Sequence, residues 1–81
     1  MERGEEKLTF DEIIAKNLRH IREQRGLLKT ELAELSGVTR VTINNIELGT
    51  RKGCNIITLN KLAKALGISI FDLLEGVDES E

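Results

Sequence analysis

Apolar residues recur at helical spacing along most of the chain. In the first run, about 10–25, they follow one another mostly three or four positions apart, as on one face of a helix. The other runs extend over about 29–36, from Thr39 to Gly49, over about 56–66, and from Ser69 to Leu74. No stretch alternates as a strand does, and the chain has no proline. The pattern predicts an all-α fold of five short helices.

Capping residues stand at the ends of these runs. Thr9 and Glu12 have the spacing of a capping box, in which each side chain bonds the other residue's backbone N–H. Asn55 is suited to begin the run at 56–66, and Gly37 to end the run at 29–36 in a left-handed conformation. These residues predict where the helices begin and end.

The segment 29–48 has the features of two helices joined by a tight corner. Two steeply crossing helices need a small residue at their contact, a positive-φ residue at the corner and apolar anchors on the second helix. The residues in those positions are Ala33, Gly37, Val38, Ile43 and Ile46. We expect Leu32, Ala33 and Leu35 to face the core. The segment therefore predicts a helix-turn-helix, whose second helix can lie in a DNA major groove.

Charge is distributed unevenly along the chain. The net charge is −2, yet residues 13–71 hold ten Lys and Arg against four acidic residues, a net +6. Residues 1–12 hold five acids against two bases, and residues 72–81 hold five acids and no base. A basic centre between acidic ends is compatible with a nucleic-acid partner, although an ordinary solvated surface is the alternative.

These features together resemble the phage repressor and Cro type of helix-turn-helix protein, the XRE family. The resemblance covers about 13–74. It is carried by LRHIREQRGL (18–27), ELA (31–33), SGVTR (36–40), TINNIE (42–47) and the segments 59–66 and 67–69. It implies a compact five-helix lambda-repressor-like domain whose second and third helices form the helix-turn-helix. We place this domain at 9–76, after a flexible extension (1–8) and before an acidic tail (77–81).

The resemblance also implies which residues read bases. Arg40 and Val41 match the two leading base-reading positions, and Asn45 and Asn44 follow on the same helix. Arginine can donate two hydrogen bonds to guanine, valine can pack on a thymine methyl group, and Asn45 suits adenine or a phosphate. The rotation of the helix could instead turn Asn44 and Thr42 toward the DNA backbone or solvent. A merely solvated polar helix face is the alternative.

Backbone contacts are expected from a second set of residues. Thr39 caps the third helix whatever the function, and its hydroxyl could also meet a phosphate. Lys29 stands where the family usually has a glutamine, and Leu28 where a polar cap is common, so the sequence departs from the family there. The predicted phosphate contacts are Lys29, Thr39, Thr42, Arg51 and Lys52.

Two further groups have structural roles by resemblance or composition. Arg22 and Glu47 match an ion pair that links the first helix to the third and orients the reading helix. The apolar residues near the end of the chain exceed what the core must absorb, although plain core packing is the alternative. The predicted dimer interface is Ile70, Leu73, Leu74 and Val77.

The sequence has no signature of an enzyme, a metal site or a membrane protein. No Gly-rich phosphate loop or nucleophile with a base is present, and Cys54 and His20 do not form a ligand set. We expect no cofactor. One cysteine, no signal peptide and no run of about 20 apolar residues indicate a cytoplasmic protein.

The expected function is sequence-specific binding of double-stranded DNA by a transcriptional regulator, with repression favoured. One helix reads only a few base pairs, so we expect a homodimer on a palindromic operator. The alternative is a protein-interaction module, such as an antitoxin or a restriction-modification controller with a partner-binding role. No particular protein partner can be named from these residues.

Overall fold

Five helices make up the part of the chain that the structure describes, residues 9–50 and 54–75 of a computed structural model. They are α1 (Phe10–Gln24), α2 (Lys29–Ser36), α3 (Arg40–Glu47), α4 (Ile56–Leu66) and α5 (Ile70–Leu73). The described residues contain no strand, which confirms the predicted all-α class. None of these helices is long and apolar enough to cross a membrane.

The helix ends follow the capping residues. At the start of α1, Glu12 donates its backbone N–H to Thr9 Oγ1 (3.1 Å), and the Thr9 N–H is donated to Glu12 Oε1 (2.9 Å). The Asn55 side chain accepts from the Thr58 N–H in the same way at α4. Gly37 ends α2 at φ 78°, where a side chain would be strained. The α3 helix ends at Glu47, two residues before the predicted stop at Gly49.

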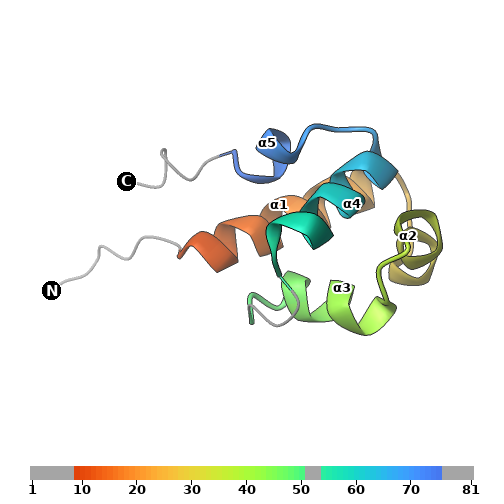
Figure 1. The fold of residues 1–81 in the computed structure, drawn as a ribbon, viewed down its shortest axis with the longest axis horizontal. Coiled ribbons are helices and arrows are strands. Elements are labelled where there is room, and N and C mark those ends of the chain that lie inside the picture. Colours follow the sequence, from red (N-terminus) through yellow and green to blue (C-terminus); the bar gives the residue numbers. More distant parts are fainter. Residues whose placement is uncertain (1–8, 51–53, 76–81) are drawn as a thin grey trace, which may run out of the picture.

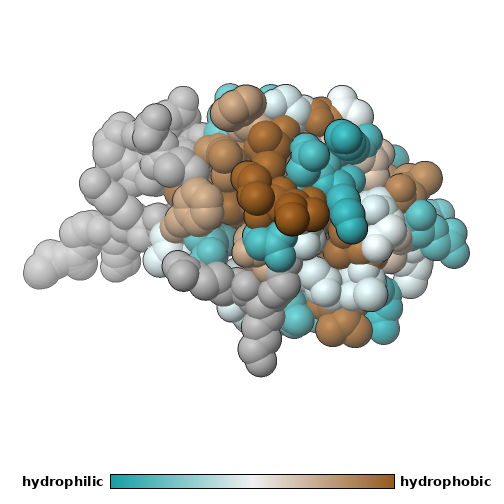
Figure 2. All heavy atoms as spheres, in the orientation of Figure 1, coloured by the Kyte–Doolittle hydropathy of each residue, from teal (hydrophilic) through white to brown (hydrophobic). Residues whose placement is uncertain are grey.

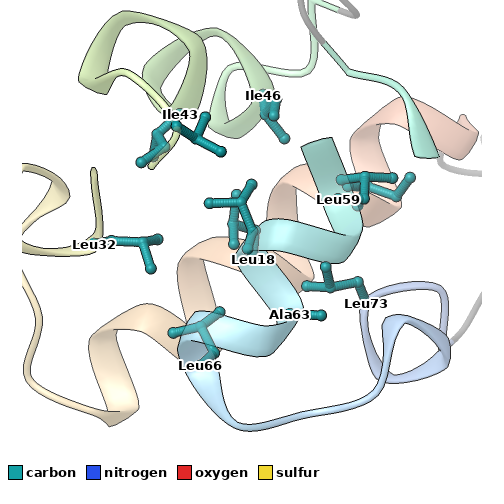
Figure 3. Packing of buried hydrophobic residues seen from close by; sticks show 11 residues of the cluster. Leu18, Leu32, Ile43, Ile46, Leu59, Ala63, Leu66 and Leu73 are labelled. Carbon is teal, nitrogen blue, oxygen red and sulfur yellow. The ribbon is translucent and has the colours of Figure 1, made fainter. Parts of the chain in front are cut away.

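The core lies between α1 and α4 and is closed by the other three helices. Figure 3 shows Leu18 of α1 among side chains that come from the other elements. The fully buried, largest members are Ile14, Leu18, Leu32, Ile43, Ile46, Leu62 and Leu73. In Figure 1, α3 lies along one side of α1 and α4, and α5 lies along the opposite side. The core therefore leaves one face of α3 turned away from the protein.

Two residues expected in the core lie on the surface instead. Leu35 is 61% exposed, so its predicted inward orientation is wrong. The inward face of α2 is centred between Leu32 and Ala33, towards Ser36, and Leu35 falls about a quarter-turn or more away from it. Ile56 opens the apolar run at 56–66, but it lies in the first turn of α4 and is exposed, so the core-facing side of that helix begins at Leu59.

A side-chain amide attaches the end of α5 to α1. The Nδ2 group of Asn17 donates to the carbonyl oxygens of Leu73 (2.8 Å) and Glu75 (2.7 Å). The Leu73 carbonyl ends α5 and has no partner within the helix, so the amide satisfies it and also binds the chain just beyond the helix at Glu75. The bond keeps α5 in a defined place although the helix has only four residues.

Candidate nucleic-acid interface

The outward face of α3 begins with Arg40 and Val41. Burial of Ile43 and Ile46 fixes the rotation of the helix, because these residues lie three positions apart on its inner side. Arg40 is exposed, and the Val41 side chain is 64% exposed although it is apolar. Asn45 follows Val41 one turn later and is half-buried. Three of the predicted base-reading residues thus lie on one accessible face.

The start of α3 is organised by two threonines. Thr39 Oγ1 accepts the backbone N–H of Thr42 at 3.1 Å, and the Thr39 hydroxyl donates to Thr42 Oγ1 at 3.0 Å. The Thr39 hydroxyl therefore has its own proton engaged within the cap. The Thr42 hydroxyl accepts in this contact and keeps its own proton, so Thr42 is the better donor towards an external oxygen.

The predicted phosphate contact Lys29 and the predicted base contact Asn44 are in contact with each other. Lys29 Nζ lies 2.7 Å from Asn44 Oδ1, and both residues are half-buried. This hydrogen bond joins the first residue of α2 to the fifth residue of α3. No local signal in the sequence could have found it, because the two residues are 15 positions apart and meet only after the corner forms.

The N-terminus of α2 compensates for the missing polar cap. Leu28 supplies no side-chain acceptor, as its apolar side chain implies. Its own backbone N–H is donated to Glu31 Oε1 at 2.8 Å. Half of a capping box is therefore present, with the glutamate but without the hydroxyl.

Arg22 and Glu47 form a buried, two-pronged ion pair that attaches α3 to α1. Arg22 Nε lies 2.7 Å from Glu47 Oε2, and Arg22 Nη2 lies 3.0 Å from Glu47 Oε1. Arg22 Nη1 donates further to the Leu27 carbonyl at 2.7 Å. The hydrogen bond to Glu47 raises the pKa of Arg22 against the opposing effect of burial, so its guanidinium stays charged. The pair fixes the last turn of α3.

The predicted dimer residues are separated by the structure. Leu73 is 0% exposed and belongs to the core, so its predicted place at a dimer interface is wrong. The short α5 helix turns Leu73 inward between α1 and α4, while Ile70 and Leu74 are half-buried. Val77, like the predicted phosphate contacts Arg51 and Lys52, lies outside the described residues.

Exposed apolar residues lie on α4 beside α5. Two shallow hollows of about 330 and 470 Å³ meet at Ile56. Figure 2 shows brown, hydrophobic atoms gathered at the centre of this face. We define the α4–α5 apolar surface by its residues Phe10, Ile56, Ile57, Ile70 and Leu74.

Comparison with known proteins agrees with this geometry. A helix-turn-helix family, HTH_3, matches residues 18–73. The chain is 41% identical over 67 residues to the control protein C.SmaI of Serratia marcescens, covering 83% of this chain and 79% of that protein. It is 32% identical over 68 residues to y4dJ of Sinorhizobium fredii, named an uncharacterized HTH-type transcriptional regulator, covering 84% of this chain and 87% of that protein.

A solved structure shows the same arrangement of helices. The restriction-modification controller protein C.AhdI from Aeromonas hydrophila superposes with a TM-score of 0.73 at 33% identity, covering 78% of this chain and 94% of that chain. The family match spans more than half of the chain and includes both helices of the corner and the ion-paired residues. The chain therefore belongs to the XRE-type helix-turn-helix family.

Proposed function

We propose that this protein is a transcriptional regulator that binds duplex DNA with α3 in the major groove, and that it acts as a repressor. The observation that carries the proposal is the outward face of α3, where an exposed valine stands beside an exposed arginine on a helix held by a buried ion pair. An exposed valine contributes nothing to solubility, but it can pack against the methyl group of a thymine. The relatives named as regulators support the same function, and we assign no enzymatic activity or cofactor.

We propose two kinds of DNA contact for these residues. We assign base reading to Arg40, Val41, Asn45 and Asn44, and backbone contacts to Lys29, Thr39, Thr42, Arg51 and Lys52. Backbone contacts position a protein on the duplex, whereas contacts to base edges specify the sequence. Such a regulator would act in the cytoplasm, where its DNA partner is accessible.

Salt dependence tests whether DNA is the partner. Each neutralised phosphate releases counterions, so log K is expected to fall with log salt by about 0.9 per phosphate contact. Selection from random duplexes, followed by a salt titration on the selected site, measures both specificity and this slope. Binding to duplex that does not change with salt would count against the proposal.

Arg40→Ala tests base reading directly. Loss of a bidentate contact to guanine is expected to cost about 1–3 kcal/mol on the selected site and to relax the preference at one base pair. Arg19→Ala is the matched control, because Arg19 is an exposed arginine of α1 that belongs to no predicted contact. Equal losses for both variants, with the preference retained, would remove Arg40 from the reading residues.

We further propose that two copies associate through the α4–α5 apolar surface and read a palindromic operator. A twofold dimer places two reading helices about 34 Å apart on half-sites, which gives the specificity that one short helix lacks. The surface combines exposed isoleucines with hollows that a second copy could fill. In Figure 1, α5 lies on the side of α1 and α4 opposite to α3, so an association through α5 would leave the outward face of α3 accessible.

Ile57→Glu tests the dimer. Ile57 is 66% exposed, so a charge there should leave the fold intact but disfavour an apolar contact, giving folded monomers with weak operator binding. Leu35→Glu is the control, since Leu35 is similarly exposed on α2. If sedimentation shows the same dimer for Ile57→Glu and for the unchanged protein, the dimer interface does not include this surface.

A second candidate function is control through a protein partner. The likeness to C.SmaI and C.AhdI favours a restriction-modification controller, and an antitoxin would need a comparable partner-binding surface. The α4–α5 apolar surface is the place where such a partner would bind. In this case Ile57→Glu would abolish the complex with the partner. The unchanged protein without its partner would be a monomer with little sequence preference on DNA.

A further inference from the structure

The hydrogen bond between Lys29 and Asn44 has a chemical consequence for recognition. Among the described residues, neither side chain forms another hydrogen bond or ion pair. Their contact therefore decides how the Asn44 amide is presented on α3. An asparagine amide normally offers one acceptor and two donors, and its usual partner adenine requires both kinds.

Lysine decides the orientation of this amide. An ammonium group has three donors and no acceptor, so only the oxygen of the Asn44 amide can face it at 2.7 Å. The amide NH₂ group therefore points away from Lys29. The ammonium also places a positive charge beside the oxygen, which disfavours the approach of another N–H donor such as adenine N6 or cytosine N4.

We propose that Lys29 is a positioning residue that restricts Asn44 to the role of a donor, so that the pair takes a hydrogen-bond acceptor and loses the two-bond preference for adenine. The acceptor is an oxygen or nitrogen of the duplex, either a phosphate oxygen or an acceptor atom on a base edge. This inference rests on the proposed function and specifies the polarity of one part of the same site.

The position of Asn44 on α3 supports this restriction. Asn44 lies four residues after Arg40, so both occupy the same side of the helix, about one turn apart. Arg40 is also a pure donor. The Lys29–Asn44 pair and Arg40 thus present only donors along one edge of the outward face of α3, and Val41 and Asn45 continue that face.

Asn44→Asp separates recognition from structure. A carboxylate still accepts from Lys29, so a link that merely holds α2 against α3 would survive, and the melting temperature should be unchanged. The carboxylate has no donors and is negative, so the affinity for the selected duplex should fall roughly 5- to 150-fold. The affinity of Asn44→Ala for the same duplex should fall by a similar factor. Combining this variant with Lys29→Met completes a double-mutant cycle.

Lys29→Met releases the amide, and Lys29→Arg keeps a donor beside it. If the acceptor is a base, Lys29→Met should shift the preference at one base pair towards adenine in a random-duplex selection. If the acceptor is a phosphate, Lys29→Met should weaken all sequences alike and reduce the slope of log K against log salt by about 0.9. In both cases Lys29→Arg should resemble the unchanged protein, and the Lys29→Met and Asn44→Ala losses should not add.

Two results would overturn the inference while leaving the proposed function intact. One is an Asn44→Asp variant that binds the selected duplex like the unchanged protein. The other is strictly additive losses in the double variant. Absence of salt-dependent duplex binding by the unchanged protein would instead refute the proposed function, and this inference with it.

Discussion

Glu47→Ala is expected to lower the free energy of unfolding by about 3–5 kcal/mol, as when one partner of a buried ion pair is removed. The cause is the Arg22 guanidinium, which would remain charged and buried without its carboxylate. A domain of 81 residues has a total stability of about 4–12 kcal/mol, so this loss removes a large share of it. Urea denaturation followed by circular dichroism measures the loss.

Two controls define the cause of that loss. Glu34→Ala removes an exposed glutamate from α2 and should change stability by less than about 0.5 kcal/mol. Arg22→Met with Glu47→Leu removes both charges and should recover most of the loss, apart from the Leu27 carbonyl that Arg22 Nη1 satisfied. A double variant no more stable than Glu47→Ala would show that the buried charge is not the cause.

The pH dependence of this pair has a definite sign. Because the folded state raises the pKa of Arg22, its contribution is fully present below the unfolded pKa and is lost only as pH rises through the raised value. That window lies far into alkali, so the ion pair should persist at neutral and moderately alkaline pH. Orientation of α3 should accordingly be insensitive to pH there.

Leu18→Ala is expected to cost about 2–5 kcal/mol and to lower the melting temperature by roughly 10–30 °C. Leu18 is fully buried and lies among side chains of the other helices, so the truncation leaves a cavity that no single helix can close (Figure 3). Thermal melting measures the change. Leu35→Ala, at an exposed leucine, should shift the melting temperature by only a few degrees, and equal shifts would contradict the core described above.

Local interactions made the helices and their ends predictable from sequence. Thr9 with Glu12, Asn55 and Gly37 each act within three or four residues, and each is found at the helix end that it was expected to define. The helix-turn-helix was predictable for the same reason, since its corner depends on Gly37 and on apolar residues close in sequence. The Arg22–Glu47 pair is not local, and only resemblance to a family indicated it.

Burial on a helix flank could not be read from spacing alone. Leu35 and Leu73 are both apolar residues in short helices, yet the first is exposed and the second is buried. An eight-residue helix can bury either side of an apolar pair, and the neighbouring helices select which side. The same packing created the α4–α5 apolar surface, because α4 begins beyond the edge of the core.

The sequence by itself determined the five helices, the corner between α2 and α3, and the apolar residues that rotate α3. Only the tertiary structure decided that Lys29 meets Asn44 and that Leu73 is unavailable to a partner. The physical reason is range: caps and turns are satisfied within one turn of chain. The polarity of the Asn44 amide and the accessibility of Leu73, in contrast, depend on side chains that approach only when separate helices pack.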